Sequence, residues 1–325
     1  MSTTTSKSLI NRAPPRSVAL ETTLLLHGVP KADGAALAKQ LADIVIAHGA
    51  NPAYIGVVSG QPIIGLNESQ LAQLFAADHV EKANTANLGL LMHRKMHAAT
   101  TVSTTMELAA SAGIRLFATG GLGGIHFGYG ESLDISADLA AFTRFPVAVV
   151  TSGVKSILDV VSTREALETL GIPVIGFRTD RFPAFYLRES PAKVDARFDD
   201  VDSLAAFIAS ELARTRRGVV IANPIPAEFE LPRTDWESWL AQAQSQAQTE
   251  GIKGRAVTPF ILGRLHALSN GKTLAANIAL IESNTALAAQ LAARISAHTS
   301  PASVSYTHLR AHETKANLVC RLLLE

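Results

Sequence analysis

The sequence has little cysteine, little net charge and no long apolar run, and each shortage excludes a class of protein. Cys320 is the only cysteine among 325 residues, so the chain can form neither an internal disulfide nor a metal site built from several cysteines. The net charge of +1 lacks the excess of lysine and arginine that binds nucleic acid. No apolar run reaches the roughly 18 residues that cross a membrane. We therefore expect a cytoplasmic protein that binds neither nucleic acid nor membranes.

The sequence is rich in hydrophobic residues, and they occur in a regular pattern along the chain. Hydrophobic residues make up 47% of the chain, and short apolar runs alternate with helical patterns between residues 17 and 298. This alternation predicts one layered α/β/α domain with a central, largely parallel sheet. Residues 1–16, rich in Ser, Thr and Pro, are predicted to be a disordered extension, with a transit peptide as the alternative.

The stretch 118–160 carries the densest set of functional signals. Glycine-containing turns follow the apolar runs 114–118 and 147–150, a pattern of strand, loop and helix that occurs twice. Ligands of open parallel sheets bind beyond the carboxyl ends of the strands, and both turns are predicted to lie there. There is no GxGxxG before a ribose-binding acid and no GxxxxGK[ST] motif.

Two kinds of ionisable side chain stand out in this stretch. Asp134 and Asp138 are four residues apart, so in a helix they would share a face and could hold a hard cation such as Mg²⁺ or Mn²⁺. Acids in the first turn of an ordinary helix are the alternative. Lys155 is predicted at the start of the next helix, among apolar residues, where the neutral amine that attacks a carbonyl is favoured. A solvated surface lysine is the alternative.

Three features lie outside this stretch. Glu21 interrupts an apolar strand, so it is either a paired buried carboxylate or an edge residue facing water. The segment 178–191, which contains arginines and aromatic residues, is either a lid or a long surface loop. Asn277 and Asn284 are seven residues apart in the last predicted helix, so both fall near one face.

Taken together, a series of segments between about residues 17 and 297 resembles the indigoidine synthase A-like family of pseudouridine-5′-phosphate glycosidases. The segments are VALETTLLLHGVP, HAATTVSTTMELAASAGIRLFATGGLGG, DISADL, SGVKSILD, ETLGIPVIGF, FPAFY, ANPIP and TPFILGRL. DISADL followed by SGVKSILD at this spacing is the most specific part of the resemblance. It implies an enzyme that reversibly cleaves pseudouridine 5′-phosphate into uracil and ribose 5-phosphate.

The bond that this family breaks joins ribose C1′ to uracil C5, so no oxygen or nitrogen leaving group can be protonated. The resemblance therefore implies a covalent route in which the sugar ring opens, a lysine bonds to C1′, and an iminium forms as uracil leaves. An acid protonates uracil C5, and water then hydrolyses the imine. The family also implies a divalent cation, Mn²⁺ or another, and a homotrimer.

The motifs carry these roles to residues of this sequence. The SGVKS motif makes Lys155 the nucleophile, and the ALET motif makes Glu21 the proton donor. The first aspartate of DISAD, Asp134, becomes the metal ligand. The remaining matches imply substrate-binding positions, which are Lys82, Val102, Ser136, Ala137, Asp138 and either Asn277 or Asn284.

The chain departs from the family pattern in two places that bear on its substrate. It has KANTANL where many relatives have a KVSRRDL-like segment, and His126-Phe127-Gly128 where relatives often have HRG. Both changes remove positive charge. Two alternatives therefore stand beside the glycosidase: an imine-forming lyase or aldolase for another sugar phosphate, and a non-catalytic sugar-phosphate-binding protein. Residues 299–325 are predicted to be a disordered or artefactual tail, because the family pattern is lost at Val304.

Overall fold

The computed structural model describes residues 9–128, 130, 133–252 and 257–298. The strands of this part of the chain are β1 (Ile10–Asn11), β2 (Ser17–Glu21), β3 (Asn51–Val58), β4 (Gln61–Ile64), β5 (Glu81–Ala83), β6 (Ala98–Thr100), β7 (Leu116–Ala118), β8 (Ala148–Thr151), β9 (Val174–Phe177), β10 (Ala196–Phe198) and β11 (Val219–Ala222). The α-helices are α1 (Lys31–Ala47), α2 (Glu68–Ala76), α3 (Leu88–His93), α4 (Val102–Ser111), α6 (Ala137–Arg144), α7 (Val160–Thr169), α8 (Val201–Thr215), α9 (Arg233–Thr249), α10 (Val257–Leu268) and α11 (Lys272–His298). A π-helical turn, η1 (Leu24–Gly28), and a 3₁₀ turn, η2 (Ala227–Phe229), complete these elements.

The strands form one mixed sheet in the order β1-β4-β3-β2-β7-β8-β11-β9-β10, and β6 pairs with both β3 and β5. The pairs β3–β4 and β3–β6 are antiparallel, whereas the pairs along β3-β2-β7-β8-β11-β9-β10 are parallel. The predicted layered α/β domain with a largely parallel sheet is confirmed. None of the described helices is long and apolar enough to cross a membrane.

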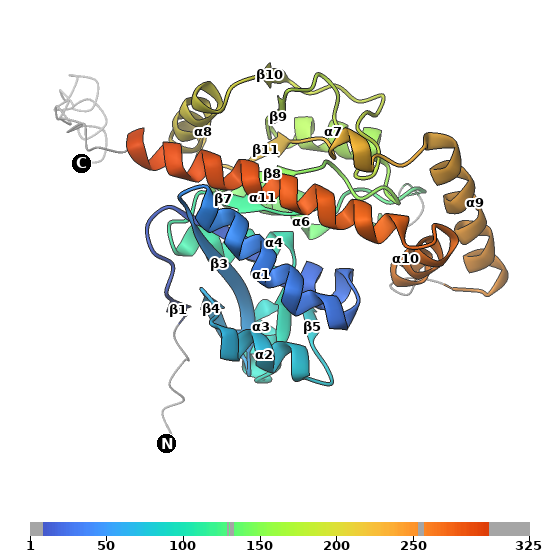
Figure 1. The fold of residues 1–325 in the computed structure, drawn as a ribbon, viewed down its shortest axis with the longest axis horizontal. Helices are drawn as coiled ribbons and strands as arrows, with labels where there is room; N and C mark the ends of the chain where they lie inside the picture. The colour runs from blue at the N-terminus through green and yellow to red at the C-terminus, as the bar shows by residue number, and fades with distance from the viewer. Residues whose placement is uncertain (1–8, 129, 131–132, 253–256, 299–325) are drawn as a thin grey trace, which may run out of the picture.

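Helices cover both faces of the sheet, which explains why its central strands are apolar along their whole length. Helix α11 packs beside α1 and α8 and against β2, β7 and β8, and Figure 1 shows this layer in front of the sheet. Helices α4 and α6 pack together, and α4 lies against β2, β3 and β7. Strands buried on both faces need apolar side chains at consecutive positions, as β8 and β11 have.

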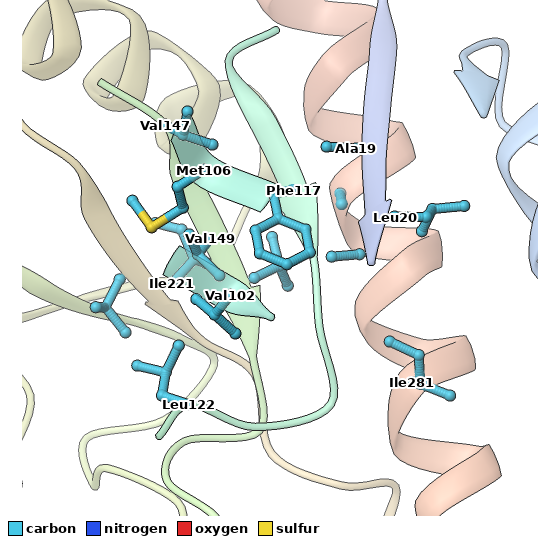
Figure 2. Close-up of a cluster of buried hydrophobic side chains, with 14 of the residues drawn as sticks. Ala19, Leu20, Val102, Met106, Phe117, Leu122, Val147, Val149, Ile221 and Ile281 are labelled. Carbon is cyan, nitrogen blue, oxygen red and sulfur yellow. The ribbon is translucent and has the colours of Figure 1, made fainter. Parts of the chain in front are cut away.

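The core surrounds β7, between the helix layers. Phe117 of β7 is fully buried, and Figure 2 shows its ring beside Val102, with Met106 and Val149 nearby. Ile281 of α11 lies on the other side of β2 in the same view. The strands that carry the site residues described below therefore start from a rigid, close-packed centre.

The N-terminal boundary of the fold differs from the sequence prediction. Residues 9–16 were predicted to be disordered, but Ile10 and Asn11 pair with Ile63 and Ile64 of β4 as a short parallel strand. The Arg12 side chain also donates a hydrogen bond of 2.9 Å to Gln70. The prediction is wrong for this segment because edge strand β4 offers free backbone groups to pair with. Residues 1–8 and the predicted tail 299–325 lie outside the described residues.

Candidate active site

A pocket of about 430 Å³ lies beyond the carboxyl ends of three adjacent strands. Glu21 is the last residue of β2, Thr119 directly follows β7, and Lys155 follows β8 by four residues. Strands β2, β7 and β8 are neighbours in the sheet, so chain segments more than 130 residues apart meet at one edge. This is the position that the rule for parallel sheets predicts.

The carboxyl group of Glu21 is buried at the base of the pocket, with 9% of the residue exposed. It accepts a hydrogen bond from the Thr119 hydroxyl. Burial raises the pKa of Glu21, and this outweighs the opposing effects of the nearby Lys155 and of Thr119. The side chain is therefore suited to hold a proton and give it away within the pocket.

Two lysines enter the same pocket from different elements. Lys82 belongs to β5, and Lys155 lies in the loop between β8 and α7. The pKa of Lys82 is lowered by burial and then by the charge of Lys155, while Glu21 opposes the shift. Three ionisable groups thus share one cavity and influence one another.

Lys155 does not occupy the helix start that the sequence analysis predicted. Helix α7 begins at Val160, where the side chain of Asp159 accepts a hydrogen bond from the Ser162 amide and acts as the N-cap. Lys155 instead lies in a loop whose backbone is fixed by a hydrogen bond of 3.1 Å from its amide to the Leu122 carbonyl. The prediction failed because Asp159 provides a stronger helix start than the segment around Lys155.

His27 is a pocket residue that the sequence analysis did not select. It lies in η1, the turn that begins three residues after Glu21, the last residue of β2. Burial lowers the pKa of His27, and the charge of Lys82 lowers it further, so the neutral imidazole is favoured. Its position just beyond the carboxyl end of a strand was the available signal.

Another part of the pocket lining is apolar and aromatic. Phe185 and Tyr186 come from the segment 178–191, Trp236 comes from α9, and Leu262 comes from α10. The rings form edge-to-face contacts, with centroids 4.7 Å apart for Phe185 and Tyr186 and 5.2 Å apart for Tyr186 and Trp236. The cavity can therefore hold a molecule with one polar part and one flat apolar part.

The two candidate asparagines of α11 occupy different environments. Asn277 lines the pocket, and its buried side-chain oxygen has no hydrogen-bond partner among the residues that the structure describes. Asn284 is fully buried beneath it, where it donates to the Thr119 carbonyl at 2.8 Å and accepts from Asn223 at 2.9 Å. Of the two asparagines, Asn277 is the one that lines the pocket.

Asp134 and Asp138 do not share a helix face, so the predicted pair is wrong. Helix α6 starts at Ala137, and Ser136 is its N-cap, which leaves Asp134 outside the helix. The Asp134 side chain is 61% exposed and lies 4.0 Å from the His126 ring. Asp138 is buried and accepts hydrogen bonds of 2.9 Å from the amides of Ser103 and Gly123. Through these two hydrogen bonds, the Asp138 carboxylate connects the start of α4 to the glycine-rich turn at residues 120–124.

The remaining predicted substrate positions are not among the pocket-lining residues. The Val102 side chain is 1% exposed and packs in the core. Ser136 and Ala137 are partly exposed at the start of α6. The close approach of this helix start requires Gly123, because a Cβ atom there would lie 2.3 Å from the Ser136 hydroxyl.

We predict that Asp138→Ala destabilises the protein, whereas Asp134→Ala does not. The first change leaves two buried amides without an acceptor, each costing about 1–3 kcal/mol. The second removes an exposed carboxylate, for which we expect less than about 0.5 kcal/mol. Urea denaturation of the two variants gives the unfolding free energies, and equal values would contradict the connecting role of Asp138.

Fold and pocket together define a class: an α/β protein in which a buried carboxyl group and two amines face one cavity at the carboxyl ends of parallel strands. Residues 8–294 match the family model described as indigoidine synthase A like protein. The chain belongs to the indigoidine synthase A-like family.

Curated relatives and solved structures of the family cover most of the chain. A pseudouridine-5′-phosphate glycosidase of Methylobacterium nodulans is 47% identical over 276 residues, which are 85% of this chain and 82% of that protein. One from Geobacillus kaustophilus is 46% identical over 86% of this chain and 93% of its own length. The indigoidine synthase A-like protein of Thermotoga maritima has a TM-score of 0.81 at 34% identity, covering 88% of this chain and 96% of that one.

A second solved structure comes from an enzyme with a different name. The prealnumycin C-glycosynthase AlnA, in complex with ribulose 5-phosphate, has a TM-score of 0.82 at 32% identity. The match covers 89% of this chain and 98% of AlnA.

Proposed function

We propose that the protein cleaves the carbon–carbon glycosidic bond of pseudouridine 5′-phosphate reversibly, giving uracil and ribose 5-phosphate. The observation that carries the proposal is the shared pocket of Glu21 and Lys155, which unites a buried acid of raised pKa with an amine. Relatives that are 47% and 46% identical are named for this activity. AlnA, whose name also denotes a C-glycoside enzyme, was solved with a pentulose phosphate.

Lys155 is the nucleophile in this proposal. Its nitrogen bonds to C1′ as the bond from C1′ to the ring oxygen breaks, and that oxygen takes up a proton. The nitrogen lone pair then forms the C1′=N bond while the bond from C1′ to uracil C5 breaks. Water adds to the resulting iminium and releases the lysine and the aldehyde of ribose 5-phosphate.

Glu21 supplies the proton that uracil C5 needs as it leaves. Its raised pKa keeps the acid form available, and its burial places the proton inside the cavity rather than in solvent. In the reverse direction the carboxylate removes the same proton. We also assign Asn277, which lines the pocket, to substrate binding.

Lys82 and His27 form the polar side of the pocket beside Lys155. We assign to Lys82 the binding of the sugar phosphate. Burial disfavours the charged form of this lysine, and a bound phosphate anion would stabilise that form. The aromatic part of the pocket lining, which includes Phe185 and Trp236, offers a flat surface for the pyrimidine.

A synthesis assay tests the proposed function. The protein is mixed with Mn²⁺, ribose 5-phosphate and uracil, and the product is separated by chromatography. We expect pseudouridine 5′-phosphate, identified by its mass and its resistance to acid hydrolysis. A lyase acting on another sugar phosphate or a non-catalytic binding protein would give no such product.

The divalent cation is a separate proposal that concerns Asp134. The described residues contain no group of three or more His, Cys, Asp or Glu side chains that could hold a metal ion, but one exposed carboxylate fits a hard cation that keeps several waters. When bound, the cation would supply positive charge for an anionic substrate. A cytoplasmic homotrimer is the remaining expectation from the family, and sedimentation velocity measures the mass that this predicts.

We predict that Asp134→Ala raises the Mn²⁺ concentration for half-maximal activity about tenfold or more. Electron paramagnetic resonance of free Mn²⁺ measures binding directly, without reference to turnover. Asp43→Ala, which removes an exposed carboxylate from α1, serves as the matched control. A wild type that stays fully active in EDTA, or equal Mn²⁺ binding by the Asp134 and Asp43 variants, would refute the metal assignment.

A further inference from the structure

The aromatic segment around Phe185 is attached to the loop that carries Lys155 on both sides of that lysine. The Phe185 amide donates to the Ser152 carbonyl at 2.8 Å, three residues before Lys155. The Ser156 hydroxyl, one residue after Lys155, donates to the Ala184 carbonyl at 2.8 Å and accepts from the Tyr186 amide at 3.3 Å. Residues 184–186 of the segment predicted as a lid or a surface loop thus support the Lys155 loop.

The Phe185 ring also lies against the glycine turn beside the Lys155 side chain. A Cβ atom added to Gly121 would lie 2.5 Å and 2.7 Å from Phe185 ring carbons, and 3.4 Å from Cγ of Lys155. The ring and the aliphatic part of the lysine therefore meet at the same face of Gly121. Only a residue without a side chain permits this approach.

The backbone of Phe185 is held in an unusual conformation. Its φ angle is +61°, in the left-handed region that bulky residues rarely adopt. Such a conformation persists only where neighbouring contacts impose it, and it is frequent at functional sites. Here the hydrogen bonds to the Lys155 loop impose it, and the ring contacts with Tyr186 and, through it, Trp236 fix the orientation of the side chain.

We infer that Phe185 is a positioning residue for Lys155, an inference that rests on the proposed function. A lysine side chain has several freely rotating bonds, and its amine must meet the C1 carbonyl carbon of the open sugar from one direction. The Phe185 ring blocks the space over Gly121 and restricts the lysine to conformations that point into the pocket. The geometry thereby raises the rate of imine formation without adding a chemical group.

The test measures imine formation at Lys155 in the full-length protein. With ribose 5-phosphate, the lysine nitrogen bonds to C1, the carbonyl oxygen leaves as water, and borohydride adds hydride to the imine carbon. Peptide mass spectrometry gives the rate of adduct formation at several sugar concentrations. The variants are Phe185→Ala, Phe185→Leu, Gly121→Ala and the double variant Gly121→Ala/Phe185→Ala.

We expect Phe185→Ala to lower the saturated trapping rate about tenfold to a hundredfold, with a smaller loss for Phe185→Leu. The sugar concentration at half saturation should change less than twofold, which separates positioning from substrate binding. Gly121→Ala should give a similar loss because its new methyl group displaces the ring. In the double variant this clash is absent, so its rate should match that of Phe185→Ala alone rather than fall further.

The matched control is Phe177→Ala, which truncates a phenylalanine of β9 that is 8% exposed, against 7% for Phe185, and does not line the pocket. We expect it to lower the melting temperature but leave the trapping rate unchanged. If Phe185→Ala does not fold, Gly121→Ala decides the question, because it removes no buried side chain.

The outcomes separate this inference from the proposed function. A wild type that forms no adduct overturns the proposed function and the inference together. A wild type that forms the adduct, with Gly121→Ala and Phe185→Leu within twofold of its rate, overturns the inference alone. A loss in Phe177→Ala equal to that in Phe185→Ala overturns it as well, since general loosening of the core would then explain both.

Discussion

Lys155→Ala is expected to lower turnover more than about ten-thousandfold while leaving the fold intact. The side chain enters the pocket from a loop whose backbone is fixed independently, through the Lys155 amide and the Ser156 hydroxyl. Removing the amine therefore deletes the nucleophile without deleting a structural contact of the backbone. The substitution removes both a repulsion from Lys82 and an attraction to Glu21, so we expect little change in the melting temperature.

Borohydride trapping with ribose 5-phosphate distinguishes this role from a role in binding. The wild type should gain the mass of the reduced sugar on the peptide that contains Lys155, and the variant should gain none. Lys39→Ala, which removes an exposed lysine of α1 paired with Asp43, is the control and should label like the wild type. Equal labelling of the Lys155 variant would assign the nucleophile to another residue.

Glu21→Gln is expected to lower turnover about a hundredfold to ten-thousandfold, the usual contribution of a general acid. The amide keeps the shape of the side chain and an oxygen that accepts from Thr119, but it cannot deliver a proton. Imine formation with ribose 5-phosphate needs no proton on uracil, so the trapped adduct should still form. A variant that loses adduct and turnover to the same extent would show that Glu21 acts before the carbon–carbon bond breaks.

The same substitution has a predicted effect on stability that depends on pH. The pKa of Glu21 is raised in the folded protein, so the folded state holds its proton more tightly than the unfolded state. This contribution to stability is fully present below the ordinary pKa of 4.5 and is lost as pH rises through the folded-state pKa. Glu21→Gln should therefore raise the melting temperature at pH 8 relative to the wild type, and the difference should shrink toward pH 4.5.

Glu107 offers a matched control for both effects. It lies on α4, outside the pocket lining, and burial raises its pKa as well. Glu107→Gln should shift stability with pH in the same direction but leave turnover unchanged. A loss of turnover in the Glu107 variant would show that changes of charge near the core, rather than loss of the proton donor, reduce activity.

The parts of the site that sequence could predict are those fixed by strand ends. Glu21 and Lys155 follow apolar runs, and the rule that ligands bind beyond the carboxyl ends of parallel strands brings such residues together. The alternating pattern likewise predicted the layered fold. It did not predict that β1 extends the sheet, because two residues carry no periodicity, and pairing depends on the free edge of β4.

Competition between local signals explains the predictions that failed. Asp134 and Asp138 have helical spacing, but Ser136 between them caps α6 through the Asp138 amide, so the helix starts after Asp134. Likewise, Asp159 fixes the start of α7 beyond Lys155. The spacing of charged residues in a sequence does not show at which residue a helix starts.

Phe185 and Trp236 could not be chosen from sequence for a different reason. Aromatic residues in apolar surroundings usually belong to the core, and the contact of Phe185 with Gly121 joins segments that are far apart in the chain. The FPAFY motif identified the segment as part of the family pattern, but it did not show where the aromatic rings point. Only the folded arrangement shows that they face the same cavity as Glu21.

The most direct test of the whole account is cleavage of pseudouridine 5′-phosphate in D₂O, followed by mass spectrometry of both products. We expect ribose 5-phosphate together with uracil that carries one deuterium at C5, delivered by an exchanged Glu21 carboxyl as the bond to C1′ breaks. Glu21→Gln should release this product at a strongly reduced rate. Failure to release uracil, or release of uracil without deuterium at C5, would contradict carbon–carbon cleavage by acid and imine catalysis.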